Sequence, residues 1–230
     1  MAYFTRAQIR TRALRKADAF GSRRWDTSTG LSGEVDQVLG TVHWKEWRRI
    51  LNANRYYRFG TRAPVSNATT GRYLLSDLDS GSADSLEKLY RVIGFTIDNI
   101  VYSQVSQDKY LLGEANNSAA RVYWREGSNL MALPKELGKV ASVFVNHLPQ
   151  RIDALATDAS EVVFPEGYEE ILALESAAML MIKGGAETNE AQSFRNLAEE
   201  LRQEMLQDIS RDSTKPMRFE PDDSSAVWGG

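Results

Sequence analysis

The spacing of apolar residues changes twice along this chain, and this change limits the folds open to it. Up to about residue 57, and again after Phe164, apolar residues recur every three or four positions, which is typical of helices with one buried face. Between Phe59-Gly60 and Phe164 they form short runs bounded by Gly, Asn, Asp and Ser, a pattern typical of strands and turns. We therefore predict two helices, a β-rich middle and two further helices.

Helix starts and stops are visible at both ends of the chain. Thr5 and Gln8 have the spacing of a capping box, so the first helix is expected to begin there and to end at Gly21-Ser22. A second helix is expected over about residues 34–57. A third helix is predicted with Pro165 in its first turn, and Gly184-Gly185 stops it.

The last predicted helix follows this stop and runs to about residue 212. The short glycine link predicts that it forms an antiparallel hairpin with the helix before it. The two apolar stripes expected to meet are Ile171, Leu174, Ala178 and Met181 on one helix, and Phe194, Ala198, Leu201 and Met205 on the other.

Six strands are predicted in the middle of the chain, with Gly127-Ser128 as a tight hairpin turn between the fourth and the fifth. A single helical turn at Ser85–Leu89 remains an alternative. The predicted strands are Arg72–Leu75, Tyr90–Ile97, Ile100–Ser103, Arg121–Glu126, Asn129–Leu133 and Val140–His147.

Together these elements predict an α+β fold. Its simplest form is an antiparallel helical bundle, built from the N- and C-terminal helix pairs, with a β-rich insertion between them. The expected division is residues 1–59 and 165–212 for the bundle, residues 60–164 for the insertion, and residues 213–230 for a flexible C-terminal tail.

Composition excludes several classes of protein. The chain has no cysteine, which rules out disulfides, thiolate zinc sites and cysteine nucleophiles. No apolar run approaches the roughly 20 residues that cross a bilayer, so we expect no membrane partner. These features fit a protein that assembles in the cytoplasm.

The sequence contains no catalytic motif that we recognise. His43 and His147 lie far apart without a metal-ligand pattern, and structural roles are predicted for both. Asp77–Gly81 imitates the start of a calcium loop, but Ser82 and Lys88 occupy the positions where an EF-hand has its glycine and glutamate. We therefore predict no catalytic, cofactor-binding or metal-binding residue, and a protein that is not an enzyme.

Charge is distributed unevenly, although the net charge is only −3. The N-terminal helix is basic, while the last helix is rich in carboxylates. These can be solvated helix faces, or the basic end can meet DNA or the acidic surface of a neighbouring copy. The candidate partner-binding cations are Arg6, Arg10, Arg12, Arg15 and Lys16.

Two tryptophan-containing segments are further candidates for binding. Trp228, in the polar tail, is predicted to anchor the tail on a partner. The segment Trp44–Arg49 mixes indoles with cations, so it can stack on single-stranded nucleic acid or form the edge of the core.

Several motifs resemble the head–tail adaptor proteins of tailed bacteriophages, also called connector or neck proteins. They cover most of the chain outside residues 60–115. The segments that carry the resemblance are Thr5–Arg10, Leu39–Trp47, Val143–Pro149, Val163–Glu170 and Ala177–Glu187.

This resemblance implies a helical bundle with a β-rich insertion. It also implies a homo-oligomeric ring of twelve copies that docks beneath the portal protein and carries a tail, tail-tube or head-closure protein below. Genomic DNA would pass through its lumen without sequence-specific contacts. The implied location is the virion neck, reached after assembly in the host cytoplasm.

Other functions compete with this one. A nucleic-acid-binding regulator would use the basic N-terminal helix and show salt-sensitive DNA affinity. A virion-associated hydrolase would need a paired acid and nucleophile. A tail terminator or a head-closure ring would share the physics of an adaptor.

Overall fold

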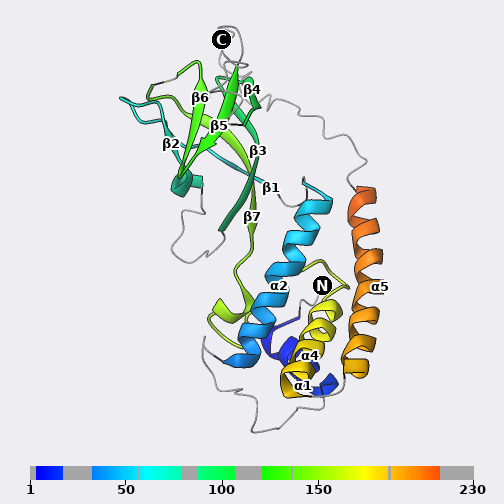
Figure 1. Cartoon of the computed structure of the whole chain (residues 1–230). Coiled ribbons are helices and arrows are strands. Elements are labelled where there is room, and N and C mark those ends of the chain that lie inside the picture. Colours follow the sequence, from blue (N-terminus) through cyan, green and yellow to red (C-terminus); the bar gives the residue numbers. More distant parts are fainter. Residues whose placement is uncertain are drawn as a thin grey trace, which may run out of the picture.

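The computed structural model describes residues 4–17, 33–55, 57, 59–78, 88–106, 121–135, 137–185 and 188–212. Within them the chain forms a helical lobe and a sheet lobe, joined by a narrow waist (Figure 1). The helical lobe contains α1 (Arg6–Lys16), α2 (Glu34–Ala53), α4 (Glu170–Gly184) and α5 (Thr188–Asp212).

The sheet lobe is one curled sheet with the strand order β1-β7-β3-β4-β5-β6-β2. All neighbouring strands are antiparallel except β4 and β5, which are parallel. The strands are β1 (Phe59–Arg62), β2 (Tyr73–Leu74), β3 (Lys88–Ile97), β4 (Ile100–Gln104), β5 (Val122–Glu126), β6 (Asn129–Leu133) and β7 (Ala141–Leu148).

All six predicted strands are confirmed, with ends that shift by at most two residues. The hairpin turn at Gly127 is confirmed as well, since its φ of 58° is one that glycine adopts without strain. β1 was not predicted because its four residues contain a glycine and no apolar alternation. It becomes a strand only through its pairing with β7.

Phe95 on β3 is the centre of the sheet core. Its buried ring stacks on Tyr123 with centroids 5.1 Å apart, and it meets Tyr73 and Tyr102 edge-on at 5.2 and 5.7 Å. Such ring pairs contribute about 0.5–1.5 kcal/mol each beyond their buried area. Four separate strands are therefore held around one aromatic side chain.

α4 is the centre of the helical lobe, because it packs against α1, α2 and α5. Its sequence is apolar on nearly every face, which suits a helix surrounded by others. The predicted antiparallel pairing of α4 with α5 is confirmed, with Ala178 and Ala198 fully buried and Gly185 in the left-handed conformation after α4.

The predicted helix ends are only partly confirmed. The capping box of Thr5 and Gln8 is present at the start of α1. α2 ends four residues before Tyr57, and α4 begins at Glu170 rather than at Pro165. Pro165 instead closes a turn by accepting a hydrogen bond from the Tyr168 amide at 3.2 Å.

The predicted bundle with a β-rich insertion is wrong. The described chain is a mixed α and β structure with four α-helices and a seven-stranded curled sheet. The sheet closes a core of its own, and the segment after β7 supplies Ile152 and Phe164 to the helical core. Helical periodicity shows only that one face is buried, and here α1 packs mainly on α4 rather than pairing with α2.

A close contact holds the segment after β7 against α2. The short 3₁₀ helix η2 (Ile152–Ala154) places the Asp153 carboxylate over Gly40. Arg151 fixes that carboxylate through two hydrogen bonds of 2.8 Å. A Cβ at position 40 would lie 2.3 Å from Asp153 Oδ1, so this contact needs a glycine.

We expect Gly40→Ala to destabilise the protein by about 1–3 kcal/mol through this overlap, although alanine normally favours a helix over glycine by about 1 kcal/mol. In an Asp153→Ala background the same substitution should instead stabilise. Urea unfolding of the wild type, the two single variants and the double variant measures this double-mutant cycle. Stabilisation by Gly40→Ala in both backgrounds would contradict the contact.

Candidate functional site

Two of the predicted partner-binding cations, the buried Arg6 and the half-buried Arg10, make contacts within the subunit. Arg6 donates to the Leu155 carbonyl at 2.8 Å and lies 3.1 Å from Asp36. Arg10 lies 3.2 Å from Asp36 and 2.5 Å from Asp158. Both arginines therefore hold α1 against Asp36 of α2 and Asp158 of the segment after β7.

The two carboxylates beside Arg6 and Arg10 have pKa values shifted in opposite directions. Burial raises the pKa of Asp36, and its neighbours Arg10 and Arg6 oppose that rise. The pKa of Asp158, which is more exposed, is lowered chiefly by its hydrogen bond from Arg10. The buried carboxylate thus depends on its two arginines for charge compensation.

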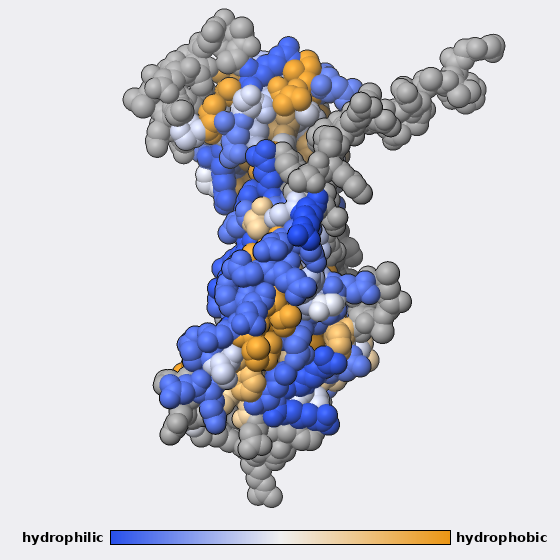
Figure 2. All heavy atoms as spheres, turned by 90° about the vertical axis from the view of Figure 1, so that its right-hand side faces the viewer, coloured by the Kyte–Doolittle hydropathy of each residue, from blue (hydrophilic) through white to orange (hydrophobic). Residues whose placement is uncertain are grey.

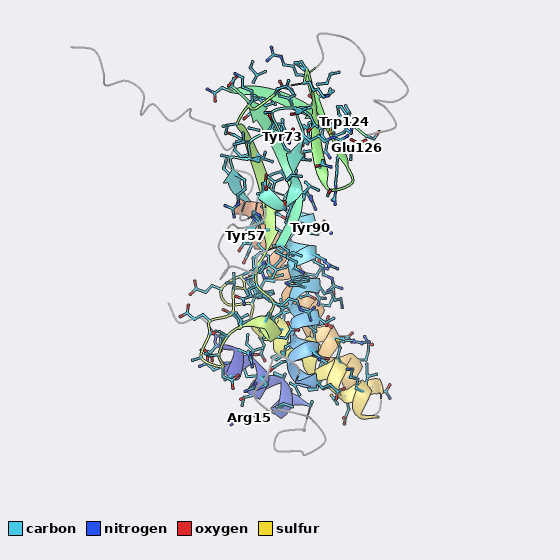
Figure 3. All side chains as sticks on the ribbon, turned by 90° about the vertical axis from the view of Figure 1, so that its left-hand side faces the viewer. Arg15, Tyr57, Tyr73, Tyr90, Trp124 and Glu126 are labelled. Carbon is cyan, nitrogen blue, oxygen red and sulfur yellow. The ribbon has the colours of Figure 1, made fainter. Side chains whose placement is uncertain are left out.

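The other predicted cations lie nearer the surface. Arg12 and Lys16 contact Glu170 at 3.1 and 2.7 Å, and the Arg12 guanidinium also lies 4.0 Å from the centre of the Phe4 ring. Arg15 is exposed at the end of the helical lobe (Figure 3). The predicted anchor Trp228 lies outside the described residues.

A buried ion network joins three helices. Arg202 on α5 is only 3% exposed and donates to both Glu46 oxygens on α2, at 2.7 and 3.0 Å. It also donates to Glu175 on α4 at 2.5 Å and to Glu199 on its own helix. A planar guanidinium can make these bonds at once because its donors form a rigid fork.

The network keeps Arg202 charged. Burial alone would lower its pKa, but the hydrogen bonds and charges of Glu46 and Glu175 outweigh burial and raise it. Sequence reasoning missed this group. The available signal was one charged residue on the apolar face of each of three predicted helices.

We expect Arg202→Met to cost about 3–5 kcal/mol of unfolding free energy, because Glu46 and Glu175 would lose their buried counter-charge. Of the described cations, only the more exposed Arg49 and Lys45, at 3.0 and 3.9 Å, would remain beside them. Adding Glu46→Leu and Glu175→Leu should restore most of that loss. Arg195→Met, on the exposed face of the same helix, should change stability by less than about 0.5 kcal/mol. Denaturant unfolding of all three would reject the network if Arg202→Met matched the control.

Both histidines have the predicted structural roles. His147 Nε2 lies 2.7 Å from the Leu78 carbonyl. His43 is fully buried, with Nε2 at 2.8 Å from the Val163 carbonyl, and Trp47 Nε1 donates to the same oxygen at 3.0 Å. Burial lowers the pKa of His43 to about 4, so this ring is neutral at pH 7.

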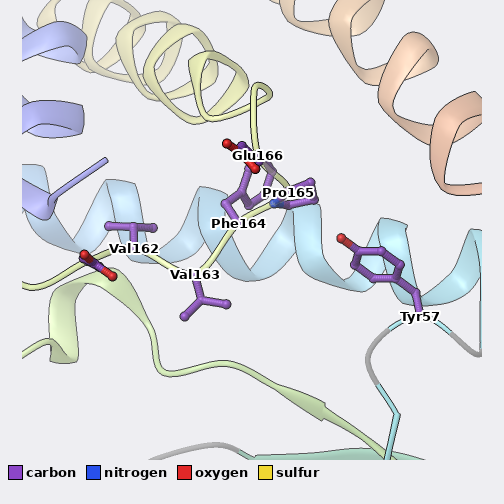
Figure 4. Close-up of a pocket in the computed structure, with 7 residues that line it drawn as sticks. Tyr57, Val162, Val163, Phe164, Pro165 and Glu166 are labelled. Carbon is purple, nitrogen blue, oxygen red and sulfur yellow. The ribbon is translucent and has the colours of Figure 1, made fainter. Parts of the chain in front are cut away.

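A hollow of about 480 Å³ is lined by Val163, the residue whose carbonyl contacts His43 (Figure 4). Val162 and Phe164 are buried residues along its wall, Tyr57 stands across from them, and Glu161 and Glu166 are exposed. The hollow is therefore a shallow, partly acidic recess beside the helical core.

His43 makes stability depend on pH. Its pKa is about 6.5 when unfolded and about 4 when folded, so protons bind the unfolded chain first as pH falls. Unfolding free energy should drop by about 3 kcal/mol between pH 6.5 and 4 for this reason. His43→Gln lacks this titration and should show a flatter profile in urea unfolding at several pH values. Identical profiles would contradict the assignment.

A basic cluster surrounds Trp44 at the junction of the lobes. We call Arg48, Lys88, Arg91 and Arg151, with Trp44, the basic waist. The charged groups of Arg48, Lys88 and Arg151 lie 6.0, 5.6 and 5.3 Å from the centre of the indole ring. Trp47 is buried in the helical core and Trp44 is half-buried against it, which fits the predicted core edge better than a nucleic-acid surface shared by both indoles.

An exposed apolar patch lies at the far end of the sheet. We call Val65, Val101, Leu137 and Val140 the apolar sheet end; they are 52–72% exposed. Val65 bridges Val140, while Thr96 pairs with both Val101 and Ser142, two residues beyond Val140. Because paired residues share a face and strands alternate, the three valines lie on the outer face together.

Metal and membrane sites were also sought among the described residues. In that part of the chain, no three His, Asp or Glu side chains converge as a metal site would require. None of the helices there has the length and apolar character to cross a bilayer. Asp77, from the candidate calcium loop, lies in the 3₁₀ helix η1 (Leu75–Leu78), and Asp79–Gly81 lie outside the described residues.

Comparison with protein-family models and with curated proteins identifies no relative. No protein-family model matches the chain, and no curated protein matches it at a significant level. A function must therefore be inferred from the residues of this chain, their contacts and the resemblance of its sequence motifs.

Proposed function

We propose that this chain is a structural head–tail adaptor of a tailed bacteriophage, which forms a ring between portal and tail. The observation that carries the proposal is the apolar sheet end. Large apolar patches are rare on monomeric soluble proteins, and they mark interfaces with other proteins. Val101, at 72% exposure, is the most exposed large apolar side chain among the described residues.

The position of this patch suits a subunit with two different partners. The apolar sheet end belongs to the sheet lobe, and the helical lobe that contains α1 lies at the other end of the molecule (Figure 1). Surface hydrophobic residues occur on both lobes, while the waist between them is mostly hydrophilic (Figure 2). A ring closed by heterologous contacts needs separate surfaces of this kind on one rigid subunit.

The motif resemblance supports the proposal through the order of its segments, not through the fold. The helical bundle with an insertion that the resemblance implied is wrong, because the described chain contains a seven-stranded sheet with its own core. We propose the implied partners with it: a ring of twelve copies of the same chain, the portal, a tail or head-closure protein, and DNA in the lumen. The neck of the virion and, before assembly, the host cytoplasm are the corresponding locations.

The regulator hypothesis has less support from the contacts. It needs a free basic face on α1, whereas Arg6 and Arg10 are bound to Asp36 and Asp158. Arg12 and Lys16 contact Glu170. We therefore do not propose that α1 reads DNA.

The apolar sheet end can be tested by adding charge to it. Val101→Lys with Val140→Lys should leave the subunit folded, because both side chains already face water, but should prevent ring formation on portal. Ile182→Lys changes an equally apolar exposed side chain at the opposite lobe and serves as the control. Size-exclusion chromatography with light scattering, with and without portal rings, measures the assembly.

The outcomes separate clearly. Rings formed by wild type and Ile182→Lys but not by the double variant support the proposal. Rings formed by the double variant as readily as by wild type would reject the apolar sheet end as an assembly contact. A wild-type protein that never associates with itself or with portal would reject the adaptor function.

A further inference from the structure

The basic waist concentrates positive charge in a chain whose net charge is negative. Arg151 is compensated by Asp153 at 2.8 Å. Within the described part of the chain, no carboxylate pairs with Arg48, Lys88 or Arg91, and Arg48 and Lys88 are exposed. The waist therefore presents at least three cations without a counter-charge among the described residues.

The protein holds these cations in place rather than letting them disperse. Trp44 is fixed because its Nε1 donates to the Pro149 carbonyl at 3.0 Å. The negative faces of its ring attract the surrounding cations. Arg48 from α2 and Lys88 from β3 are thereby brought together from two lobes.

Arg91 extends the waist toward the sheet. It donates to Asn52 Oδ1 at 2.6 Å, and Tyr90 donates to the same oxygen at 2.9 Å. Figure 3 shows Tyr90 where the strands reach the end of α2. The side chain of Arg91 is therefore oriented by a neighbour on α2, with further N–H donors left for a ligand.

A hollow of about 730 Å³ in the curled sheet continues from this point. Lys88, Arg91 and Arg125 line it, together with donors from Ser76 and Tyr123, and none of the described residues that line it is a carboxylate. Cations from β3 and β5 thus face one concave space that opens beside the waist. This space extends the positive surface from α2 onto the sheet.

We propose that the basic waist binds the phosphate backbone of nucleic acid without reading its sequence. Lys and Arg side chains with free N–H donors are the groups that neutralise phosphates. A protein partner fits less well, since protein interfaces centre on apolar anchors. None of the described exposed large apolar side chains belongs to the waist or lines the hollow.

The same geometry accounts for the absence of base reading. The indole of Trp44 is surrounded by three cations and held at its Nε1 by Pro149, so it is not an open platform for a base. Backbone contacts alone bind all sequences alike. The identification of the nucleic acid as DNA in a ring lumen rests on the proposed function. The binding of phosphates by the basic waist does not depend on it.

The test measures binding of a short fluorescein-labelled duplex to the isolated subunit by anisotropy, in about 50–200 mM salt. Arg48→Gln with Lys88→Gln should weaken binding about tenfold and reduce the slope of log affinity against log salt by about 2. A duplex of scrambled sequence should bind equally well. Circular dichroism confirms that each variant is folded.

The matched control removes two other exposed cations, Arg72→Gln with Lys183→Gln, which changes net charge equally. Arg72 and Lys183 already contact Glu126 and Glu34, at 3.8 and 3.2 Å, and lie outside the waist. The control should bind within about twofold of wild type, since each of these cations already has a carboxylate beside it that competes with a phosphate. Equal losses in both double variants would show a diffuse charge effect and overturn the proposal.

Three further outcomes would overturn it. The first is a wild type that binds neither duplex nor single strand. The second is binding of single strands alone that is lost on Trp44→Ala, which would indicate base stacking. The third is tighter binding of polyglutamate than of duplex, which would assign the basic waist to an acidic protein. Ring assembly is not needed for these measurements. Failed DNA binding with intact rings, or the reverse, therefore distinguishes this proposal from the adaptor function.

Discussion

The helical lobe depends on the neutralisation of one buried positive charge. Arg202 lies inside the contact of α2, α4 and α5, and Glu46 and Glu175 supply its counter-charges from the other two helices. Apolar contacts tolerate small slips between helices, but a forked guanidinium and two carboxylates match in only one register. We infer that the network favours one alignment of the three helices, while the apolar residues around it supply most of the driving force for burial.

The alignment of these helices in turn positions the waist. α2 carries Gly40, which lets η2 approach, and Trp44, whose Nε1 binds the chain just after β7. β3 and β7 pair along their whole length, so fixing the end of β7 also fixes the start of β3. The cations around Trp44 therefore come from three segments that only the contact between the two lobes brings together.

Local features were well predicted from the sequence. Six strands, the capping box of Thr5 and the α4–α5 hairpin all depend on residues close together in the chain, or on one strong stop signal at Gly184-Gly185. The candidate site was predicted less well. Arg6 and Arg10 were grouped with the surface cations because their partners Asp36 and Asp158 are distant in sequence, and β1 was missed because its pairing with β7 is equally remote.

The sequence by itself determined where the four described helices and six of the seven strands form, because backbone propensity, capping and the period of apolar residues act over a few residues. Only the tertiary structure decided what each buried face packs against: the closed core around Phe95, the central place of α4, the burial of Arg202 and the exposure of Val101. The physical reason is that a charge or an apolar side chain has the same local pattern whether it is buried or exposed. Its role depends on neighbours that the fold brings from elsewhere in the chain.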